Sequence, residues 1–327
     1  MNKQPPAEFP CDLHSHSTCS DGRDTPEELI ENAAARKLRV LVLSDHDKIP
    51  PAYIRDSDSE VPIREYASKR GLVLIPGMEV SCETSVDDVH IVCVGCDWKA
   101  PFFEEIESFT VRSKIKAYKE LVCRLREDGY GITWDHVLMR QGKKIEETQV
   151  QKKMIFDALS ELGFAPTWAE AKAIVNRTAR YHIAREKPDA LRVIENVHLA
   201  GGYAILAHPF LIPEAVCSAG KTLSREEFIE TLLQAGLDGI EIRYPYHKTS
   251  YTGSLSDEEL ETIVSERYAS RVRMISGGSD YHAEHKTNAA LPRQLGECGL
   301  TWEEFFGNPY WQRVISDIDS QIDETSL

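Results

Sequence analysis

Histidines and carboxylates recur along this sequence directly after short apolar runs. The first group is Asp12-Leu-His14-Ser-His16, at the end of a run that begins at Cys11. Residues two apart in a strand point to the same side, so we expect His14 and His16 to project together toward one metal ion. Side chains of the same kinds follow at later positions: Asp21, His46, Glu79, His90, His208, Asp280 and His282.

The composition of this set restricts its chemistry. Each residue alone could be a structural histidine or a helix-capping carboxylate, but the same placement recurs at nearly every strand end. Imidazole and carboxylate donors without thiolate suit zinc, manganese or ferrous iron. Nine donors exceed the needs of one ion, so we expect two or three divalent ions, with Glu79 able to bridge two of them. Such ions can together polarise a phosphoryl oxygen, which favours a metal-dependent hydrolase and most simply a phosphoesterase.

Seven short strands, alternating with amphipathic helices, would position these residues. That pattern is typical of an α/β fold with parallel strands. In barrels of parallel strands, active-site residues come from the C-terminal strand ends, and all the motifs except His90 fit this rule. We expect the strands near Cys11–His14, Val40–Leu43, Leu72–Ile75, His90–Val94, Tyr203–Ala207, Gly239–Ile242 and Val272–Ile275. We expect helices at Thr25–Lys37, Ile63–Arg70, Pro188–Ala200, Arg225–Ala235 and Asp257–Ala269.

The alternation of strands and helices is interrupted between the fourth and fifth strands. From about Phe102 to Lys187 the chain is helical and charged, with no convincing strand. We therefore expect a barrel domain of residues 1–128 and 188–327, with residues 129–187 as a helical insertion or cap.

Bulk composition narrows the class of substrate and the location. The 327 residues carry a net charge of −15, from 53 acidic and 38 basic side chains, whereas proteins that bind long nucleic acid normally show a basic face. No signal peptide and no run of about 18 apolar residues is visible, and the eight cysteines lack a disulfide rhythm. We expect a cytoplasmic protein that acts on small substrates and does not enter a membrane.

Six motifs between Asp12 and His282 together resemble those of the PHP family, named for its polymerase and histidinol-phosphatase members. They are D-x-H-x-H-S, S-D-H-D, G-x-E, an isolated histidine on the fourth strand, A-H-P and G-S-D-x-H. The resemblance implies a distorted, TIM-like (β/α)7 barrel, which agrees with the seven expected strands.

The resemblance also implies three metal subsites. His14, His16, Glu79 and Asp280 would hold the first ion, and Glu79, His90 and His208 the second. The third would be held by Asp21, His46 and His282. Some family members have histidine at the position of Asp21, a difference that changes ligand hardness and bears on occupancy of this subsite.

The expected reaction is hydrolysis of a phosphate ester by attack of a metal-bound hydroxide, on a small metabolite or nucleotide. The resemblance suggests nucleoside 3′,5′-bisphosphates, short oligonucleotide 5′ ends or cyclic sugar phosphates. We expect catalytic roles for Glu79, His208 and His282. Candidate substrate contacts, which could equally form a solvated basic surface, are Arg180, His182, Arg185, Lys187, Arg243 and His247.

Three other readings of the sequence stay open. An amidohydrolase also begins with H-x-H on a barrel, although that superfamily typically uses a lysine bridge rather than a glutamate. A processive exonuclease or proofreading module fits poorly with the acidic chain and the lack of an attached polymerase. A metal-stabilised binding or regulatory domain without activity would usually have lost ligands, and here all nine positions hold competent side chains.

Overall fold

One seven-stranded sheet organises the structure, a computed structural model that describes residues 5–56, 59–82, 89–140, 142–218, 220–287 and 289–324. The strands follow the spatial order β1-β2-β5-β6-β9-β12-β13. Their bounds are Cys11–Asp12, Val40–Leu43, Val73–Ser81, His90–Val94, Tyr203–Leu206, Gly239–Arg243 and Met274–Gly277. Just beyond the two edge strands, Ser15 and Tyr281 form a parallel bridge, so the sheet nearly closes on itself as a barrel.

Strand β6 departs from the parallel arrangement expected from the sequence. It pairs antiparallel with both β5 and β9, with Ser81 opposite His90 and Ile91 opposite Leu206. All the other neighbouring strands of the sheet run parallel. Because β6 is reversed, its first residue, His90, lies at the edge where the neighbouring strands end. This reversal explains how a histidine at the start of a strand can join side chains from the ends of the others.

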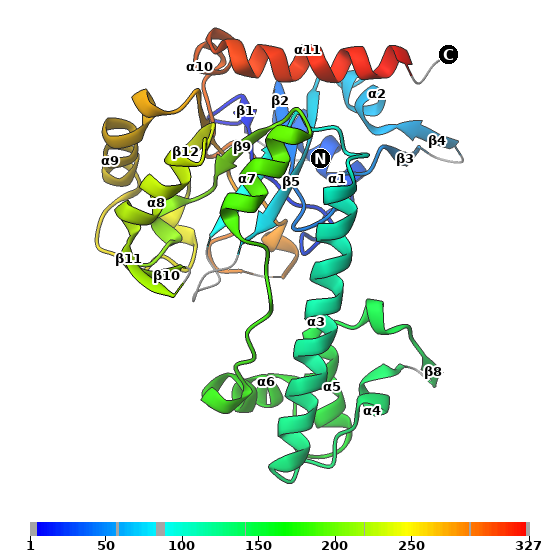
Figure 1. Ribbon diagram of the computed structural model, residues 1–327. Helices are drawn as coiled ribbons and strands as arrows, with labels where there is room; N and C mark the ends of the chain where they lie inside the picture. The colour runs from blue at the N-terminus through cyan, green and yellow to red at the C-terminus, as the bar shows by residue number, and fades with distance from the viewer. Residues whose placement is uncertain are drawn as a thin grey trace. The chain divides into compact units, whose positions relative to one another are not determined.

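Buried apolar side chains on the strands and helices form the barrel core. Every residue of β2 and β9 is buried, as expected for strands of a sheet that is covered on both faces. One core cluster joins Leu13, Ile75 and Ile205 of the strand region to Trp311 and Val314, which lie on the last helix. That helix, α11 (Pro309–Glu324), lies across one end of the sheet in Figure 1.

Several helices around the sheet begin at conventional capping residues. Helix α1 (Pro26–Ala35) has Thr25 as N-cap in a reciprocal bond with Glu28, and proline at its first position. Helices α8 (Arg225–Gln234) and α9 (Asp257–Tyr268) begin with the same capping box. The other helices of this part of the chain are α2 (Ile63–Ser68), α7 (Ala190–Leu199) and α10 (Trp302–Gly307).

The loops also contain short strands and 3-10 helices that the sequence pattern did not predict. Two-stranded antiparallel hairpins form from β3 (Tyr53–Asp56) with β4 (Ser59–Pro62), β7 (Met139–Arg140) with β8 (Lys143–Lys144), and β10 (Ala215–Ser218) with β11 (Lys221–Ser224). Short 3-10 helices lie at Glu147–Gln149, Ala179–Tyr181, Pro209–Leu211, Tyr246–Lys248, Ala269–Arg271 and Glu284–Thr287.

The chain divides into two compact units. The first comprises Met1–Ile106 and Pro188–Leu327, and the second is Glu107–Lys187. The second unit starts before residue 129, where the sequence pattern places the insertion, because Leu121 and Leu125 of helix α3 (Pro101–Glu127) pack in its core. That core also includes residues of α4 (Trp134–Leu138), α5 (Lys152–Glu161) and α6 (Trp168–Arg177). No helix in the described part of the chain is both long and apolar enough to cross a membrane.

Candidate metal centre

The nine histidines and carboxylates singled out by the sequence all lie in the first unit, at the same edge of the sheet. Three groups of them bring one donor atom per residue within 4.8 Å of one another. The groups are His14, His16, Glu79 and Asp280; His46, Glu79 and His90; and His16, Asp21, His46 and His282. His208 joins the second group, because its Nε2 lies 3.1 Å from Glu79 Oε1.

Glu79 lies at the centre of the cluster and is 1% exposed. Its Oε2 atom lies 3.2 Å from the Nε2 atoms of both His14 and His16, and 3.0 Å from His46 Nδ1. Its Oε1 atom lies 2.9 Å from His90 Nδ1 and 3.1 Å from His208 Nε2. The two oxygens of one carboxylate therefore face two different sets of imidazoles, which is the arrangement needed to bridge two ions.

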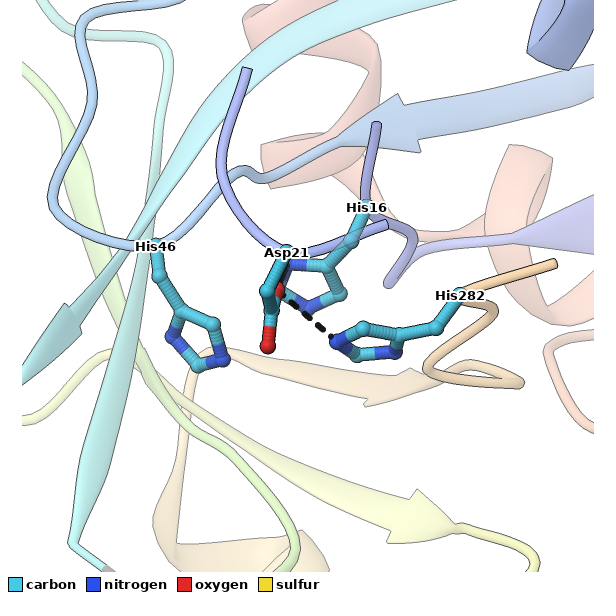
Figure 2. Close-up of side chains that lie close together, drawn as sticks. All are labelled: His16, Asp21, His46 and His282. Atoms are coloured by element: carbon cyan, nitrogen blue, oxygen red, sulfur yellow. Dashed lines mark hydrogen bonds and ion pairs between the residues drawn. The ribbon is translucent and has the colours of Figure 1, made fainter. Parts of the chain in front are cut away.

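Asp280 and Asp21 close the cluster on the side of His282. Asp280 Oδ1 lies 3.0 Å from His16 Nε2 and 3.5 Å from His14 Nε2. Asp21 Oδ1 lies 3.1 Å from His282 Nε2, the contact drawn as a dashed line in Figure 2. Figure 2 shows the side chains of His16, Asp21, His46 and His282 directed toward one common region.

Buried donor atoms without a hydrogen bond test whether these residues suit metal ions. Among the described residues, Glu79 Oε2 makes no hydrogen bond although three imidazole nitrogens lie 3.0–3.2 Å away. Two of these nitrogens, the Nε2 atoms of His14 and His16, also lie only 3.1 Å from each other. Leaving a buried carboxylate oxygen unsatisfied is costly, and a cation between Glu79 Oε2 and these nitrogens would satisfy it. The donor set and its geometry therefore fit divalent ions.

The pKa values of the cluster show the same demand for positive charge. Burial alone would raise the pKa of Glu79, but His46, His14 and His90 outweigh burial and hold that pKa well below its ordinary value. Burial opposes protonation of His16, yet the carboxylates of Asp280 and Glu79 beside it raise the imidazole pKa to about 10. For His46, in contrast, burial dominates and lowers the pKa to about 3. The carboxylates thus stay ionised and require cations beside them, as protons or as metal ions.

Backbone strain concentrates at the same edge of the sheet. His208, Asp47 and Asp280 have φ values of 30°, 49° and 48°, in the left-handed region that non-glycine residues rarely adopt. Each follows a strand and is held by surrounding contacts; the backbone N–H of His208, for example, donates to Glu241 Oε2 at 2.7 Å. Such strain is typical of residues whose side chains must be aimed at a functional site.

Two buried aspartates within the motifs organise the loops rather than enter the cluster. Asp12 accepts hydrogen bonds from the backbone N–H and hydroxyl of Ser279, and so ties the first strand to the loop of Asp280. Burial raises the pKa of Asp12 to about 6. Asp45 accepts from Ser17 and Ser20, the residues that lead into Asp21.

Three residues at the site escaped the sequence reasoning. Glu241, 2% exposed, lies with Oε1 3.4 Å from His14 Nδ1. Tyr244 donates its hydroxyl to Asp280 Oδ2 at 2.8 Å. Arg293 pairs with both Asp280 and Glu284. In Gly239-Ile-Glu241-Ile a polar residue alternates with apolar ones, which only weakly indicates a role for Glu241 at the site. No local sequence pattern indicates such a role for Arg293.

Of the six substrate contacts proposed from the sequence, the two in the first unit do not line the cavity over the cluster. Arg243 pairs with Glu261 and Glu304, and exposed His247 contacts Asp257, so neither is among the side chains that line the cavity over the cluster. The other four proposed substrate contacts belong to the second unit: Arg180, His182, Arg185 and Lys187. All nine proposed ligands belong to the first unit. Within that unit, Arg180 pairs with Glu127 and Asp128.

A cavity of about 240 Å³ opens over the cluster. His46, Glu79, His90, His208 and Asp280 form one part of its lining. The other lining residues are Leu211, Tyr244, Lys248, Thr249, Ser250, Glu284 and Arg293. The site is thus a small polar chamber lined by proposed metal ligands and by cationic and hydroxyl groups.

Three relatives with assigned activities share between 28% and 29% of their residues with this chain. A 5′-3′ exoribonuclease of Haemophilus influenzae is 29% identical over 199 residues, which are 61% of this chain and 68% of the relative. A phosphoribosyl 1,2-cyclic phosphate 1,2-diphosphodiesterase of Eggerthella lenta is 29% identical over 285 residues, covering 84% and 94%. A 3′,5′-nucleoside bisphosphate phosphatase of Chromobacterium violaceum is 28% identical over 285 residues, covering 83% and 87%.

A solved structure supports the fold directly. A candidate metal-dependent phosphoesterase of Bifidobacterium adolescentis superposes with a TM-score of 0.63 at 29% identity, covering 93% of this chain and 96% of that protein. The predicted α/β barrel of seven strands is thereby confirmed. Fold, donor cluster and relatives together define a metal-dependent phosphoesterase.

The family model for the PHP domain matches residues 12–199, which is more than half of the chain. The chain belongs to the PHP domain family, so the resemblance carried by the sequence motifs is confirmed.

Proposed function

We propose that this phosphoesterase hydrolyses a phosphate ester of a small metabolite or nucleotide. The substrate would be a nucleoside 3′,5′-bisphosphate, a short oligonucleotide 5′ end or a cyclic sugar phosphate, the compounds suggested by the names of the relatives. The observation that supports the proposal is the position of the Glu79 carboxylate, whose two oxygens face different sets of imidazoles. A bridging carboxylate of this kind suits a pair of ions acting on one phosphoryl group.

Each subsite would draw on residues from several strands. His14, His16, Glu79 and Asp280 would hold one ion, and Glu79, His90 and His208 would hold a second, with His46 also 3.0 Å from Glu79. Asp21, His46 and His282 would hold a third. When bound, manganese, zinc or ferrous ions would polarise the phosphoryl oxygens and activate a water molecule.

The chain itself orients the groups around the reaction. Tyr244 and Arg293 hold Asp280 from one side, which fixes the direction of its Oδ1 toward His16. Glu79 serves as the bridge, and we assign His208 and His282 the handling of protons near the ester oxygens. For His208 this role requires Nδ1, because Nε2 already faces Glu79. No hydrogen bond among the described residues occupies that Nδ1 atom.

The small chamber agrees with a compact substrate rather than with a long polymer. Its volume of about 240 Å³ lies below the usual range for ligand sites, which is roughly 300–1,000 Å³. Lys248 and Arg293 supply cationic groups on its wall, in a chain with a net charge of −15. Local positive charge within an acidic protein favours a small anion that can enter the chamber.

The test is turnover by protein stripped of metal and reconstituted with Mn²⁺. The panel would contain nucleoside bisphosphates, sugar phosphates, cyclic phosphates, short 5′-phosphorylated oligonucleotides and an amide, with phosphate release and product masses recorded. We expect metal-dependent cleavage of one phosphoester class, and loss of that cleavage in E79Q. Control variant E261Q removes a partly exposed carboxylate paired with Arg243 and should retain full turnover.

Two outcomes would count against the proposal. Full turnover by E79Q would show that the bridge is not needed. If protein that retains its metal ions hydrolyses none of the phosphoesters, a binding or regulatory role is favoured. Cleavage of the amide alone would favour an amidohydrolase.

A further inference from the structure

The loop after β12 places one lysine on the cavity wall. Among the residues of this loop, Arg243 and His247 contact acidic partners, whereas the adjacent Lys248 lines the cavity over the metal centre. Thr249 and Ser250 continue the same wall. The side chain of Lys248 is 14% exposed, so its ammonium group is held within the structure rather than extended into solvent.

Two contacts hold the ammonium group of Lys248 and leave part of its hydrogen-bonding capacity for a ligand. Its Nζ donates to the backbone oxygen of Pro292 at 3.2 Å and pairs with Glu297. An ammonium group has three N–H donors, and these two contacts are the ones found for Lys248 among the described residues. The third donor is therefore available to a ligand in the cavity that Lys248 lines.

Arg293, the other Lys or Arg side chain in the described lining, is committed to the protein. It contacts Asp280 and Glu284 through three of its nitrogen atoms, and its Nη2 also lies 3.1 Å from His282 Nδ1. Two carboxylates thus neutralise its charge. Lys248 is left as the cation best able to meet an incoming anion.

The proposed ligands and Lys248 line the same small cavity. Its volume is about 240 Å³, and its lining includes His46, Glu79, His90 and His208 together with Lys248. A phosphoryl group held at the proposed ligands would therefore share this chamber with the Lys248 ammonium group, which forms charge-assisted N–H···O bonds over about 2.7–2.9 Å.

We propose that Lys248 binds a non-bridging oxygen of the phosphoryl group that is transferred. This inference rests on the proposed phosphoester hydrolysis and adds a residue that contacts the reacting group. A lysine held by Glu297 and Pro292 needs little reorganisation to stabilise charge that develops on that oxygen. Phosphate affinity and the turnover number should therefore both depend on the ammonium group.

The experiment compares K248Q, K248R and the double variant K248Q/E297Q with the unmodified chain. The double variant removes the carboxylate that K248Q would leave unpaired, so it separates ligand binding from folding. The matched control is K286Q, because Lys286 also holds an ammonium between carboxylates (Asp24 and Glu28) and a backbone oxygen but does not line the cavity. Each Mn²⁺-loaded protein is assayed for metal content, for binding of inorganic phosphate by calorimetry, and for turnover on the ester panel.

We expect K248Q and K248Q/E297Q to bind inorganic phosphate about 10- to 100-fold more weakly and to lose turnover to a similar or greater degree. Metal content should not change, and K248R should recover part of the affinity. K286Q should remain within about twofold of the unmodified chain in phosphate affinity, because Lys286 does not line the cavity.

Several outcomes would overturn the assignment. Unchanged phosphate affinity in both glutamine variants, an equal loss in K286Q, or a parallel loss of metal would each do so. A turnover loss confined to esters with a second anionic group, with unchanged phosphate affinity, would place Lys248 against that other group instead. If phosphate binding depends on Lys248 while no ester is cleaved, the anion contact stands and the proposed hydrolysis fails.

Discussion

Glu241 accepts a hydrogen bond from the backbone N–H of His208 at 2.7 Å, while its other carboxylate oxygen lies 3.4 Å from His14 Nδ1. One buried carboxylate on β12 thus contacts two proposed ligands, one at the end of β1 and one after β9. Metal-binding histidines commonly direct their second nitrogen to a carboxylate, which fixes the ring and increases its basicity. Glu241 provides this support and also holds the strained backbone of His208, whose φ is 30°.

The variant E241Q should therefore weaken metal binding without unfolding the protein. Glutamine keeps an acceptor for the His208 N–H but removes the negative charge beside His14. We expect about a 10- to 100-fold loss of Mn²⁺ or Zn²⁺ affinity, measured by titration of the metal-free protein. E261Q, which changes a partly exposed partner of Arg243, is the control. Equal affinities for E241Q and the unmodified chain would remove Glu241 from the metal centre.

Asp45 should govern the subsite that contains Asp21. Its carboxylate accepts from the N–H and hydroxyl of Ser17 at 2.8 and 2.6 Å, and from the hydroxyl of Ser20 at 2.6 Å. In D45N one of these acceptors becomes a donor, so the segment that carries Asp21 loses its anchor. We expect about one bound ion fewer per chain, counted by elemental analysis after dialysis, with the exposed D56N as control. Unchanged stoichiometry in D45N would contradict this role.

Sequence reasoning found the proposed ligands because each lies beside a short apolar run. His14, His46 and Asp280 follow strands and Glu79 lies near the end of β5, and the nearly closed sheet brings these ends to one edge. The motifs also identified the family and the seven-stranded barrel, both confirmed. The sequence did not predict the direction of β6, because an apolar run of five residues has the same pattern in either direction. His90 was therefore the one proposed ligand expected at the start of a strand, and the reversal of β6 brings it to the same edge as the others.

The supporting residues depended on contacts that local patterns do not encode. Glu241 alternates with isoleucines as any polar strand residue would, and only the approach of β1 and β9 gives it partners. Arg293 lies outside the helices and strands, so no periodicity indicated which way it points. At the end of β12 and in the loop after it, the sequence drew attention to Arg243 and His247, yet the cationic residue that lines the cavity is Lys248. A shift of one residue in a loop changes which side chain enters a site.

Buried thiols should be protected from alkylation in the native protein. Burial raises the pKa of the Cys11 thiol to about 12, and it raises that of Cys93 well above its ordinary value. A raised thiol pKa lowers the fraction of reactive thiolate at pH 8, and burial also blocks the reagent. Iodoacetamide at pH 8 should modify exposed Cys217 first and spare Cys11 and Cys93, as read by peptide mass spectrometry. Early modification of Cys93 would contradict the packing of β6.

Arg293 should matter most for stability when metal ions are absent. It pairs with Asp280 and Glu284, with the side chains of Arg293 and Asp280 only 11% and 10% exposed. In R293M the two carboxylates would lose their cation, and breaking a buried pair on one side costs about 3–5 kcal/mol. We expect a decrease of that order in the unfolding free energy of the metal-free protein, measured by urea denaturation. K69M, which breaks an exposed pair with Glu65, should cost less than about 1 kcal/mol. Added Mn²⁺ should restore part of the loss in R293M, because an ion beside Asp280 replaces the missing positive charge. Equal stability of R293M and the unmodified chain would show that Asp280 does not depend on this arginine.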